Sequence, residues 1–465
     1  MKDTHLFIAI HRLIMPILAL FAFQLMLHGQ QNHNSILFTN VRIFDGNSEQ
    51  LTEPSNLLVE GNTIAKISTA PIALSSVTST TIIDGSGRVL IPGLIDAHWH
   101  FLPDQDFIST SASHLGRNGD FGYLNIIAGI EAKKTLLRGF TTVRDMAGPT
   151  FGLKAAIDEG SIAGPRIYPS GAIIVKTAGH GDSRKLTDLH PRFGGTIPHG
   201  DVVGTSVIAD GRSEVLAAVR EQLREGATQI KLAAGGGIAS ESDPLDSLQF
   251  TPDELDAAVE AASDWGTYVT VHNYSSEGAR RAISAGVKCI EHGQLIGEPT
   301  MKLVAEKGIW LSIQPFLPAT DKSRLSTEFV NSDRKSAKAI LVTEGTDHAY
   351  TLARKYHVKL AFGSDLVGKS DVAAHENERL VALSKWFTPA EILRMATASN
   401  GELVALSGAR NPYPERLGVI EVGAYADLLL VNGNPLQDIN LLSSPDKSLA
   451  VIIKNGEVIK NTPEK

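Results

Sequence analysis

The chain has 465 residues, a length that suits one large domain and a smaller one. Hydrophobic residues make up 43% of it and charged residues 20%, so it can bury an ample core. The formal net charge is −8 and no run of Lys or Arg is present, which excludes nucleic acid as a partner and favours small substrates over polyanions.

Residues 1–30 are predicted to be a signal peptide. Lys2 and Arg12 precede the apolar run 13–27, which is shorter than the roughly 20 residues of a membrane span. An uncleaved anchor is the alternative, because no well-formed cleavage site follows the run. We expect an exported protein, periplasmic or secreted, with no stable membrane span after removal of the leader.

Both ends of the remaining chain have the pattern of short strands separated by Gly-bearing turns. Residues 36–44 near the N-terminus and 426–431 and 451–458 near the C-terminus alternate or are continuously apolar. Neither end holds enough strands for a domain alone. We therefore predict one small β-sandwich built from residues 31–92 and 408–465, with the middle of the chain inserted between them.

The middle, residues 93–407, repeats an amphipathic helix, a glycine that ends it and an apolar strand. Eight such strands are predicted, near residues 94–98, 140–144, 167–174, 228–232, 267–272, 287–291, 309–313 and 358–363. Strands alternating with helices in this number fit an α/β fold of the (β/α)8 TIM-barrel type. A doubly wound open sheet is the alternative, but no Gly-rich phosphate turn follows the first strand.

Residues of the kinds that bind metals stand where the predicted strands end, which is the edge where such barrels carry their active sites. His98 and His100 lie two apart on an extended segment, so both imidazoles point the same way. This pair alone is a weak signal. Four further strand ends carry Lys231, His272, His292 and Asp365. Each has a purely structural explanation, but six such residues at five strand ends indicate a metal site.

Lys231 can take part only after modification, because an ammonium group has no lone pair. A neutral amine can react with carbon dioxide to give a carbamate, whose two oxygens can bridge two divalent ions. N6-carboxylysine at Lys231 would then be shared by two metal sites. The first site is completed by His98, His100 and Asp365, and the second by His272 and His292. Nitrogen and oxygen ligands favour two Zn²⁺ ions, while Mn²⁺, Co²⁺ and Fe²⁺ stay open as alternatives.

Five stretches carry a resemblance to a known family: Leu90–His100 (LIPGLIDAHWH), 271–274 (VHNY), 286–293 (GVKCIEHG), 362–365 (FGSD) and 423–431 (GAYADLLLV). The chain resembles the amidohydrolase superfamily over nearly everything after the leader. Within it, the chain is most similar to the imidazolonepropionase-like branch, which contains Xaa-Pro dipeptidases, lysine/arginine (zinc) carboxypeptidases and ochratoxin-type amidases. The resemblance implies a carboxylated Lys231 between two metals, and contacts from His180 and Tyr274 to the scissile carbonyl.

We therefore expect a binuclear hydrolase that cleaves an amide or peptide bond next to a free carboxylate. The substrates expected are small molecules or short peptides, such as Xaa-Pro dipeptides, C-terminal residues, N-acyl amino acids or ochratoxin-like amides. In the expected mechanism, His180 and Tyr274 donate hydrogen bonds to the oxyanion, and Asp365 carries the proton to the leaving amine.

Further substrate contacts are predicted from position alone. Arg184, Lys185 and Arg192 lie in the loop after the third strand and could meet a carboxylate, although a charged surface loop explains them equally well. Gln314 ends the seventh strand and is expected to line the pocket. The Gly-rich segment 233–246 is expected to cover it.

Other functions stay open at this point. A mononuclear hydrolase of cyclic amides, or a deaminase, would use the histidines and Asp365 and leave Lys231 without a role. A barrel of this fold used only for assembly, or a periplasmic metal-binding protein without turnover, are the non-enzymatic alternatives. A homo-oligomer is expected in each case.

Overall fold

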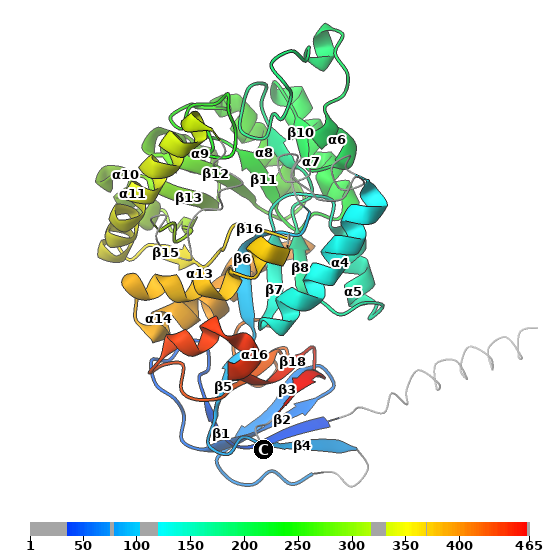
Figure 1. Cartoon of the computed structure of the whole chain (residues 1–465), viewed down its shortest axis with the longest axis vertical. Coiled ribbons are helices and arrows are strands. Elements are labelled where there is room, and N and C mark those ends of the chain that lie inside the picture. Colours follow the sequence, from blue (N-terminus) through cyan, green and yellow to red (C-terminus); the bar gives the residue numbers. More distant parts are fainter. Residues whose placement is uncertain (1–34, 75–78, 103–119, 318–331, 369, 463–465) are drawn as a thin grey trace, which may run out of the picture.

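The computed structural model describes residues 35–74, 79–102, 120–317, 332–368 and 370–462. Strands from the two ends of the chain gather at one end of the molecule, and the middle of the chain forms the larger part (Figure 1). The predicted leader lies outside the described residues. Within the described ranges, no helix combines the length and the apolar character needed to cross a membrane.

One mixed sheet contains strands from both ends of the chain. Its N-terminal strands are β1 (Ser35–Ile43), β2 (Ser55–Glu60), β3 (Thr63–Ser68), β4 (Thr80–Asp84) and β5 (Val89–Pro92). Its C-terminal strands are β17 (Leu428–Val431), β18 (Leu449–Lys454) and β19 (Glu457–Asn461). The order is β19-β18-β17-β5-β1-β2-β3, with β4 paired to β1. The two ends meet where β17 pairs antiparallel with β5, with Leu430 opposite Leu90.

Two parallel sheets form the core of the larger part. The first has the order β16-β6-β7-β8, with β6 (Leu94–His100), β7 (Phe140–Asp145), β8 (Arg166–Pro169) and β16 (Leu366–Val367). The second has the order β10-β9-β11-β12-β13-β14-β15. Its strands are β9 (Ile173–Val175), β10 (Ser206–Ile208), β11 (Ile230–Ala233), β12 (Val269–Ser275), β13 (Cys289–Leu295), β14 (Trp310–Ser312) and β15 (Lys359–Ala361). The predicted α/β class with parallel strands is confirmed.

The third predicted strand differs from the structure. Residues 167–174 form not one strand but the end of β8 and the start of β9, which belong to different sheets. The chain turns at Gly171, which has a φ of +69°. This left-handed backbone angle favours glycine, and a Cβ there would also displace the Gln222 amide, whose Oε1 accepts from Ala172 N.

Backbone hydrogen bonds connect the two parallel sheets at two places. Ala97 N donates to Phe362 O over 2.9 Å, and Thr228 N donates to Pro169 O over 2.8 Å. The Asn400 amide strengthens the first junction, since its Nδ2 donates to the carbonyl oxygens of Ile95 and Phe362 at 2.6 and 2.7 Å. The strands of both sheets are thereby held in fixed register around the site described below.

Helices cover the outside of these parallel strands (Figure 1). The longer ones are α4 (Phe121–Leu137), α5 (Phe151–Asp158), α7 (Arg212–Glu225), α8 (Pro252–Asp264), α9 (Ser276–Ala285), α10 (Glu298–Glu306), α11 (Asp333–Lys355) and α13 (Glu376–Ala382). The shorter ones are α6 (His199–Val203), α12 (Ser370–Ala373), α14 (Pro389–Arg394), α15 (Asn400–Ala405) and α16 (Pro445–Ser448). Single turns are η1 (Pro191–Phe193), η2 (Leu383–Lys385), η3 (Met395–Ser399), η4 (Gly408–Arg410) and η5 (Ile439–Ser443). Capping boxes begin α8 at Thr251 and α14 at Thr388.

Candidate active site

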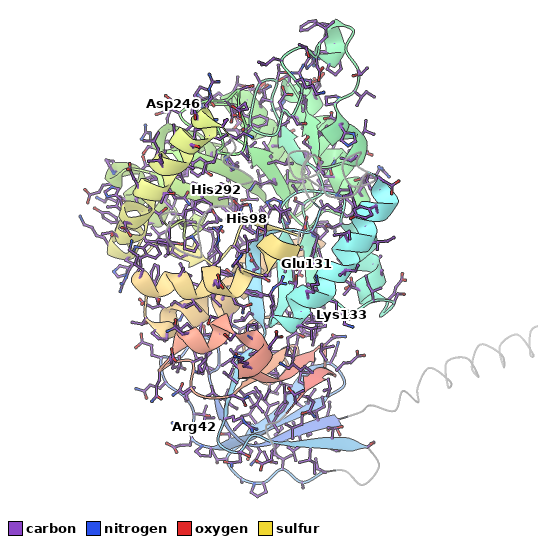
Figure 2. All side chains as sticks on the ribbon, viewed as in Figure 1. Arg42, His98, Glu131, Lys133, Asp246 and His292 are labelled. Carbon is purple, nitrogen blue, oxygen red and sulfur yellow. The ribbon has the colours of Figure 1, made fainter. Side chains whose placement is uncertain are left out.

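A cavity of about 260 Å³ lies where the carboxyl ends of several parallel strands meet. Figure 2 locates His98 and His292 within the larger part of the molecule, far from Arg42 in the terminal sheet. The cavity is lined by all six predicted ligands and both predicted carbonyl contacts: His98, His100, Lys231, His272, His292, Asp365, His180 and Tyr274. Its volume is close to the lower end of the range of small-molecule sites.

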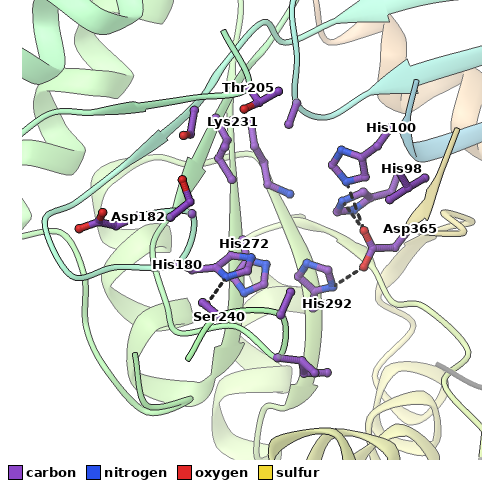
Figure 3. Close-up of a pocket in the computed structure, with 18 of the residues that line it drawn as sticks. His98, His100, His180, Asp182, Thr205, Lys231, Ser240, His272, His292 and Asp365 are labelled. Atoms are coloured by element: carbon purple, nitrogen blue, oxygen red, sulfur yellow. Dashed lines mark hydrogen bonds and ion pairs between the residues drawn. The ribbon is translucent and has the colours of Figure 1, made fainter. Parts of the chain in front are cut away.

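Three predicted ligands converge on one point. The Nε2 atoms of His98 and His100 each lie 3.3 Å from Oδ1 of Asp365. One candidate ligand atom from each of these residues falls within 4.8 Å of the others. Figure 3 shows both imidazoles directed at the Asp365 carboxylate, with His292 approaching its other oxygen. Two nitrogens and a carboxylate oxygen in this arrangement suit a divalent cation.

Asp365 is held ionised, with an uncommon backbone conformation. Burial alone would raise the pKa of its carboxyl, but His98, His100 and His292 around it lower the pKa below the ordinary value.

Two of these residues have unusual backbone angles. The φ of Asp365 is 54° and that of His292 is 79°, in a region that non-glycine residues rarely adopt. Such conformations cost about 1–3 kcal/mol each and are concentrated at functional sites.

Four aromatic rings lie beside this group. The ring of His272 lies 4.3 Å from that of His292 between centroids, and His180 stacks on His272 at 4.1 Å with 27° between the planes. The Tyr274 ring is 5.0 Å from His292. The amine of Lys231 extends into the space between the His98–Asp365 group and the His272–His180 pair (Figure 3).

Each of three predicted ligand histidines is held in place through one ring nitrogen. His98 Nδ1 lies 2.9 Å from Glu291 Oε2, and His292 Nδ1 lies 2.6 Å from Gln314 Oε1. His272 Nε2 lies 3.2 Å from the carbonyl oxygen of Gly236. All three partners are oxygens that only accept, so these nitrogens donate. The opposite nitrogens keep their lone pairs for a metal, as in known metal sites.

The ionisation of the site favours metal ligation. Burial lowers the pKa of His98 to about 4, and it lowers the pKa values of His272 and His292 well below their ordinary value. All three imidazoles are therefore neutral near pH 7, as metal binding requires. Burial also lowers the pKa of Lys231 to about 8, which makes the neutral amine accessible near neutral pH.

Glu291 is a site residue to which the sequence analysis assigned no function. Its Oε2 accepts from His98, while its Oε1 accepts from the hydroxyl of Thr270 and, over 2.7 Å, from Arg144 Nη2. Burial would raise the pKa of Glu291, but Arg144 and His98 hold it well below the ordinary range. Arg144 also donates from Nε to Ala97 O over 2.6 Å. The available signal in the sequence was Arg144, a charged residue inside the predicted strand 140–144, because a buried charge needs a partner.

Of the three basic residues predicted to bind a substrate carboxylate, one lines the cavity but is paired with an aspartate, and two lie outside the cavity lining. Arg184 lines the cavity, but its guanidinium donates to both carboxylate oxygens of Asp182, with Nε at 2.8 Å from Oδ1. Lys185 and Arg192 are not among the lining residues, and Arg192 pairs with Glu214.

Gln314 also differs from its expected position. Its side chain is fully buried and outside the cavity lining, where it holds His292 and donates to Ser312 O over 3.1 Å. Two buried cations that the sequence analysis missed, Lys335 of α11 and Arg379 of α13, do line the cavity. They stand on helices far along the chain from the strand ends, and no sequence pattern connects them to the site.

Comparisons with known proteins identify a family and several similar structures. The amidohydrolase family matches residues 89–459. Ochratoxinase of Aspergillus niger is 32% identical over 382 residues, which are 80% of this chain and 76% of that protein. The crystal structure of a prolidase complexed with N-methylphosphonate-L-proline superposes with a TM-score of 0.80 and 30% identity, covering 92% of this chain and all of that one. A Xaa-Pro dipeptidase with bound methionine has a TM-score of 0.75 and 29% identity, covering 91% and 99%.

The position of Gln314 predicts that it acts on metal affinity and not on substrate. Gln314→Met removes the acceptor of His292 Nδ1 and is expected to weaken metal binding about 10- to 100-fold, with KM unchanged. Competition with a chromogenic chelator measures the first quantity. Gln437→Met on the exposed surface is the control. Unchanged metal affinity together with a raised KM would contradict this role and support the prediction that Gln314 contacts the substrate.

Proposed function

Because the chain belongs to the amidohydrolase family, we propose that it is a binuclear metal-dependent amidohydrolase that cleaves an amide or peptide bond next to a free carboxylate. The observation that carries this proposal is one cavity lined both by six candidate metal ligands and by two buried basic residues, Lys335 and Arg379. The ligands offer sites for two metals, and the cations offer a site for a carboxylate.

The donor set fits two divalent ions, with Zn²⁺ the preferred metal. His98, His100 and Asp365 would hold one ion, His272 and His292 the other, and a carboxylated Lys231 would hold both. The accessible neutral amine of Lys231 supports the carbamate. When bound, the ions would polarise the scissile carbonyl and lower the pKa of the attacking water.

Residues of the chain would supply the proton transfer and the oxyanion contacts. The Asp365 carboxylate would accept the proton of the attacking water and return it to the leaving amine. Burial raises the pKa of Tyr274 well above its ordinary value, so its hydroxyl stays protonated and can donate to the carbonyl oxygen. His180, whose pKa is lowered by burial, is neutral and offers a second donor.

The substrate class follows from the remaining lining residues. Lys335 and Arg379 are suited to a carboxylate, and the Arg379 guanidinium lies 5.3 Å from the centre of the Phe316 ring. Ile238 and Leu102 add apolar surface. We propose N-acyl amino acids and dipeptides, including those of the Xaa-Pro type, with ochratoxin-like amides as a further group.

We propose also that the two connected parallel sheets form one (β/α)8 barrel, residues 93–407, inserted into a β-sandwich of residues 31–92 and 408–465. The hydrogen bonds at both sheet junctions and the pairing of β5 with β17 support this description. Export to the periplasm or the medium is proposed from the apolar run 13–27 after two basic residues. Assembly into a homo-oligomer stays a prediction.

A substrate panel tests the function. Purified protein loaded with Zn²⁺ is expected to hydrolyse members of a panel of Xaa-Pro dipeptides, peptides with basic C-termini and N-acyl amino acids. Asp365→Asn is expected to keep its metal and to lose about 10²–10⁴-fold in kcat. Asp256→Asn on the exposed surface of α8 is the control. No turnover across the panel with metal bound would contradict the proposed activity. Near-native activity of Asp365→Asn would contradict the proposed role of Asp365.

One observation favours a second candidate, a mononuclear hydrolase of cyclic amides or a deaminase. Among the residues that the structure describes, the tight metal-type group is His98, His100 and Asp365, without His272 and His292. Metal analysis by mass spectrometry separates the two candidates. Two ions per wild-type chain and one in Lys231→Ala are expected. One ion in both proteins would favour the mononuclear alternative.

The proposed carboxylate site makes Arg379 a determinant of KM. Arg379→Met is expected to raise KM for an N-acyl amino acid or dipeptide about 10- to 100-fold, because a hydrogen bond to a charged group contributes about 1.5–3 kcal/mol. The matching substrate with a C-terminal carboxamide is expected to respond far less. Arg220→Met on the exposed surface of α7 is the control. Equal KM values for wild type and variant would remove Arg379 from the site.

A further inference from the structure

We propose that Arg138, at the end of α4, is a positioning residue for the carboxylate site, because it holds the start of α13 and thereby fixes where Arg379 stands relative to the metal ligands. This role rests on the proposed function, since Arg379 is taken to bind the substrate carboxylate. Arg138 is not among the residues that line the cavity, so it acts on the substrate only through α13.

The Arg138 side chain is fixed to its own helix by two contacts. The residue is the C-cap of α4, and its side chain is 11% exposed. Its Nη1 donates to Glu131 Oε1 over 2.8 Å, and its Nη2 donates to Thr135 Oγ1 over 2.9 Å. Since a guanidinium is planar and carries its donors in a rigid fork, these two contacts also determine where Nε points.

The same residue binds the start of α13. Arg138 Nε donates to Glu376 Oε2 over 2.7 Å, and Arg138 O accepts from Asn377 Nδ2 over 3.1 Å. The side chains of Glu376 and Asn377 are both buried, and a hydrogen bond with an ionised partner is stronger in such surroundings than one exposed to water. The first two residues of α13 are therefore tied to a single residue of α4.

The start of α13 leads directly to Arg379. Arg379 N donates to His375 O over 2.9 Å, so residues 375–379 form one hydrogen-bonded turn. Residues three apart on a helix lie on the same side, which places Glu376 beside Arg379. Arg379 lines the cavity, where its guanidinium lies 5.3 Å from the centre of the Phe316 ring. A shift of this turn would therefore move the Arg379 side chain with it.

Arg138 also contacts the strand that carries two predicted metal ligands. Its guanidinium carbon lies 5.6 Å from the centre of the Trp99 ring, and Trp99 stands between His98 and His100 on β6. One side chain thus touches both the strand of the metal ligands and the helix of the carboxylate site. The distance between these two sites decides which amide bond of a substrate reaches the metals, and such geometry has to be held within about 0.5 Å. Arg138 thereby favours the bond next to the carboxylate.

A matched pair of variants tests this role. Glu376→Ala breaks the contact between Arg138 and α13, whereas Glu131→Ala removes a likewise buried carboxylate from the same guanidinium and leaves that contact in place. Glu376→Ala is expected to raise KM for an N-acyl amino acid about 3- to 10-fold, with metal content and KM for the matching carboxamide unchanged. Glu376→Gln keeps an acceptor for Arg138 and is expected to retain most of the wild-type affinity. The same KM ratio of carboxylate to carboxamide in Glu376→Ala as in Glu131→Ala would overturn the proposal.

A double-mutant cycle separates positioning of Arg379 from general destabilisation. Arg138→Met is expected to raise the same KM ratio about 3- to 10-fold in the wild-type background and to leave it unchanged in Arg379→Met, because residues that act through one contact are not additive. An equal effect of Arg138→Met in both backgrounds would contradict the proposal. Should Arg138→Met not fold, Glu376→Ala takes its place in the cycle.

Hydrogen exchange gives a readout that does not need turnover. Peptides that cover α13 are expected to exchange about tenfold faster in Glu376→Ala than in wild type or Glu131→Ala, because the local opening of the helix becomes easier. Wild-type exchange of α13 in Glu376→Ala would overturn the proposal.

Failure of the proposed function would appear differently, as absent turnover of the whole panel by metal-loaded wild type. The N-acyl amino acid and its carboxamide are then compared by calorimetric binding, and Kd takes the place of KM. A higher Kd for the carboxylate in Glu376→Ala but not in Glu131→Ala would still support the role of Arg138. Wild type that does not prefer the carboxylate, or equal Kd ratios in both variants, would overturn it.

Discussion

The buried ion pair between Arg144 and Glu291 is the constraint on which the site depends. Both side chains are fully buried, and together they connect β7 and β13 to β6 through Ala97 and His98. Removing one partner of such a pair costs about 3–5 kcal/mol, since the other charge stays buried without compensation. The anionic state of Glu291 in turn requires His98 to donate from Nδ1. This ion pair therefore influences both the packing of three strands and the orientation of His98, the first predicted ligand.

The other predicted ligand histidines are also oriented by hydrogen-bond partners. Gln314 fixes His292, and the Gly236 carbonyl fixes His272, so the lone pairs are arranged by hydrogen bonds that do not need the metal. The unusual backbone angles of His292 and Asp365 have the same consequence, because a strained backbone persists only where its surroundings over-determine it. The predicted ligands are thus preorganised, and little conformational freedom would be lost if a metal binds there as proposed.

The family and the hydrolysis of amide or peptide bonds that the sequence predicts are confirmed by the family match and the relatives. Strand ends could be predicted because periodicity and Gly caps are local, and His98, His100 and Asp365 do converge on one point. The break at Gly171 was missed because positive φ leaves no periodic trace in the sequence. Arg379 and the true position of Gln314 depend on packing between segments distant in the chain, which a single sequence does not encode locally.

The pairing of β5 with β17 has a consequence for the order in which this protein is made. β5 is followed within two residues by β6, which carries His98, while β17 lies near the far end of the chain. During synthesis, the ribosome releases the β17 partner only after nearly all of the larger part has emerged. Until then, β5 lacks its β17 partner and leaves one strand edge unpaired. Pairing between such distant segments is slow, and an unpaired edge is prone to aggregation. A nascent chain of this fold would therefore gain from chaperones that hold its first strands until translation ends.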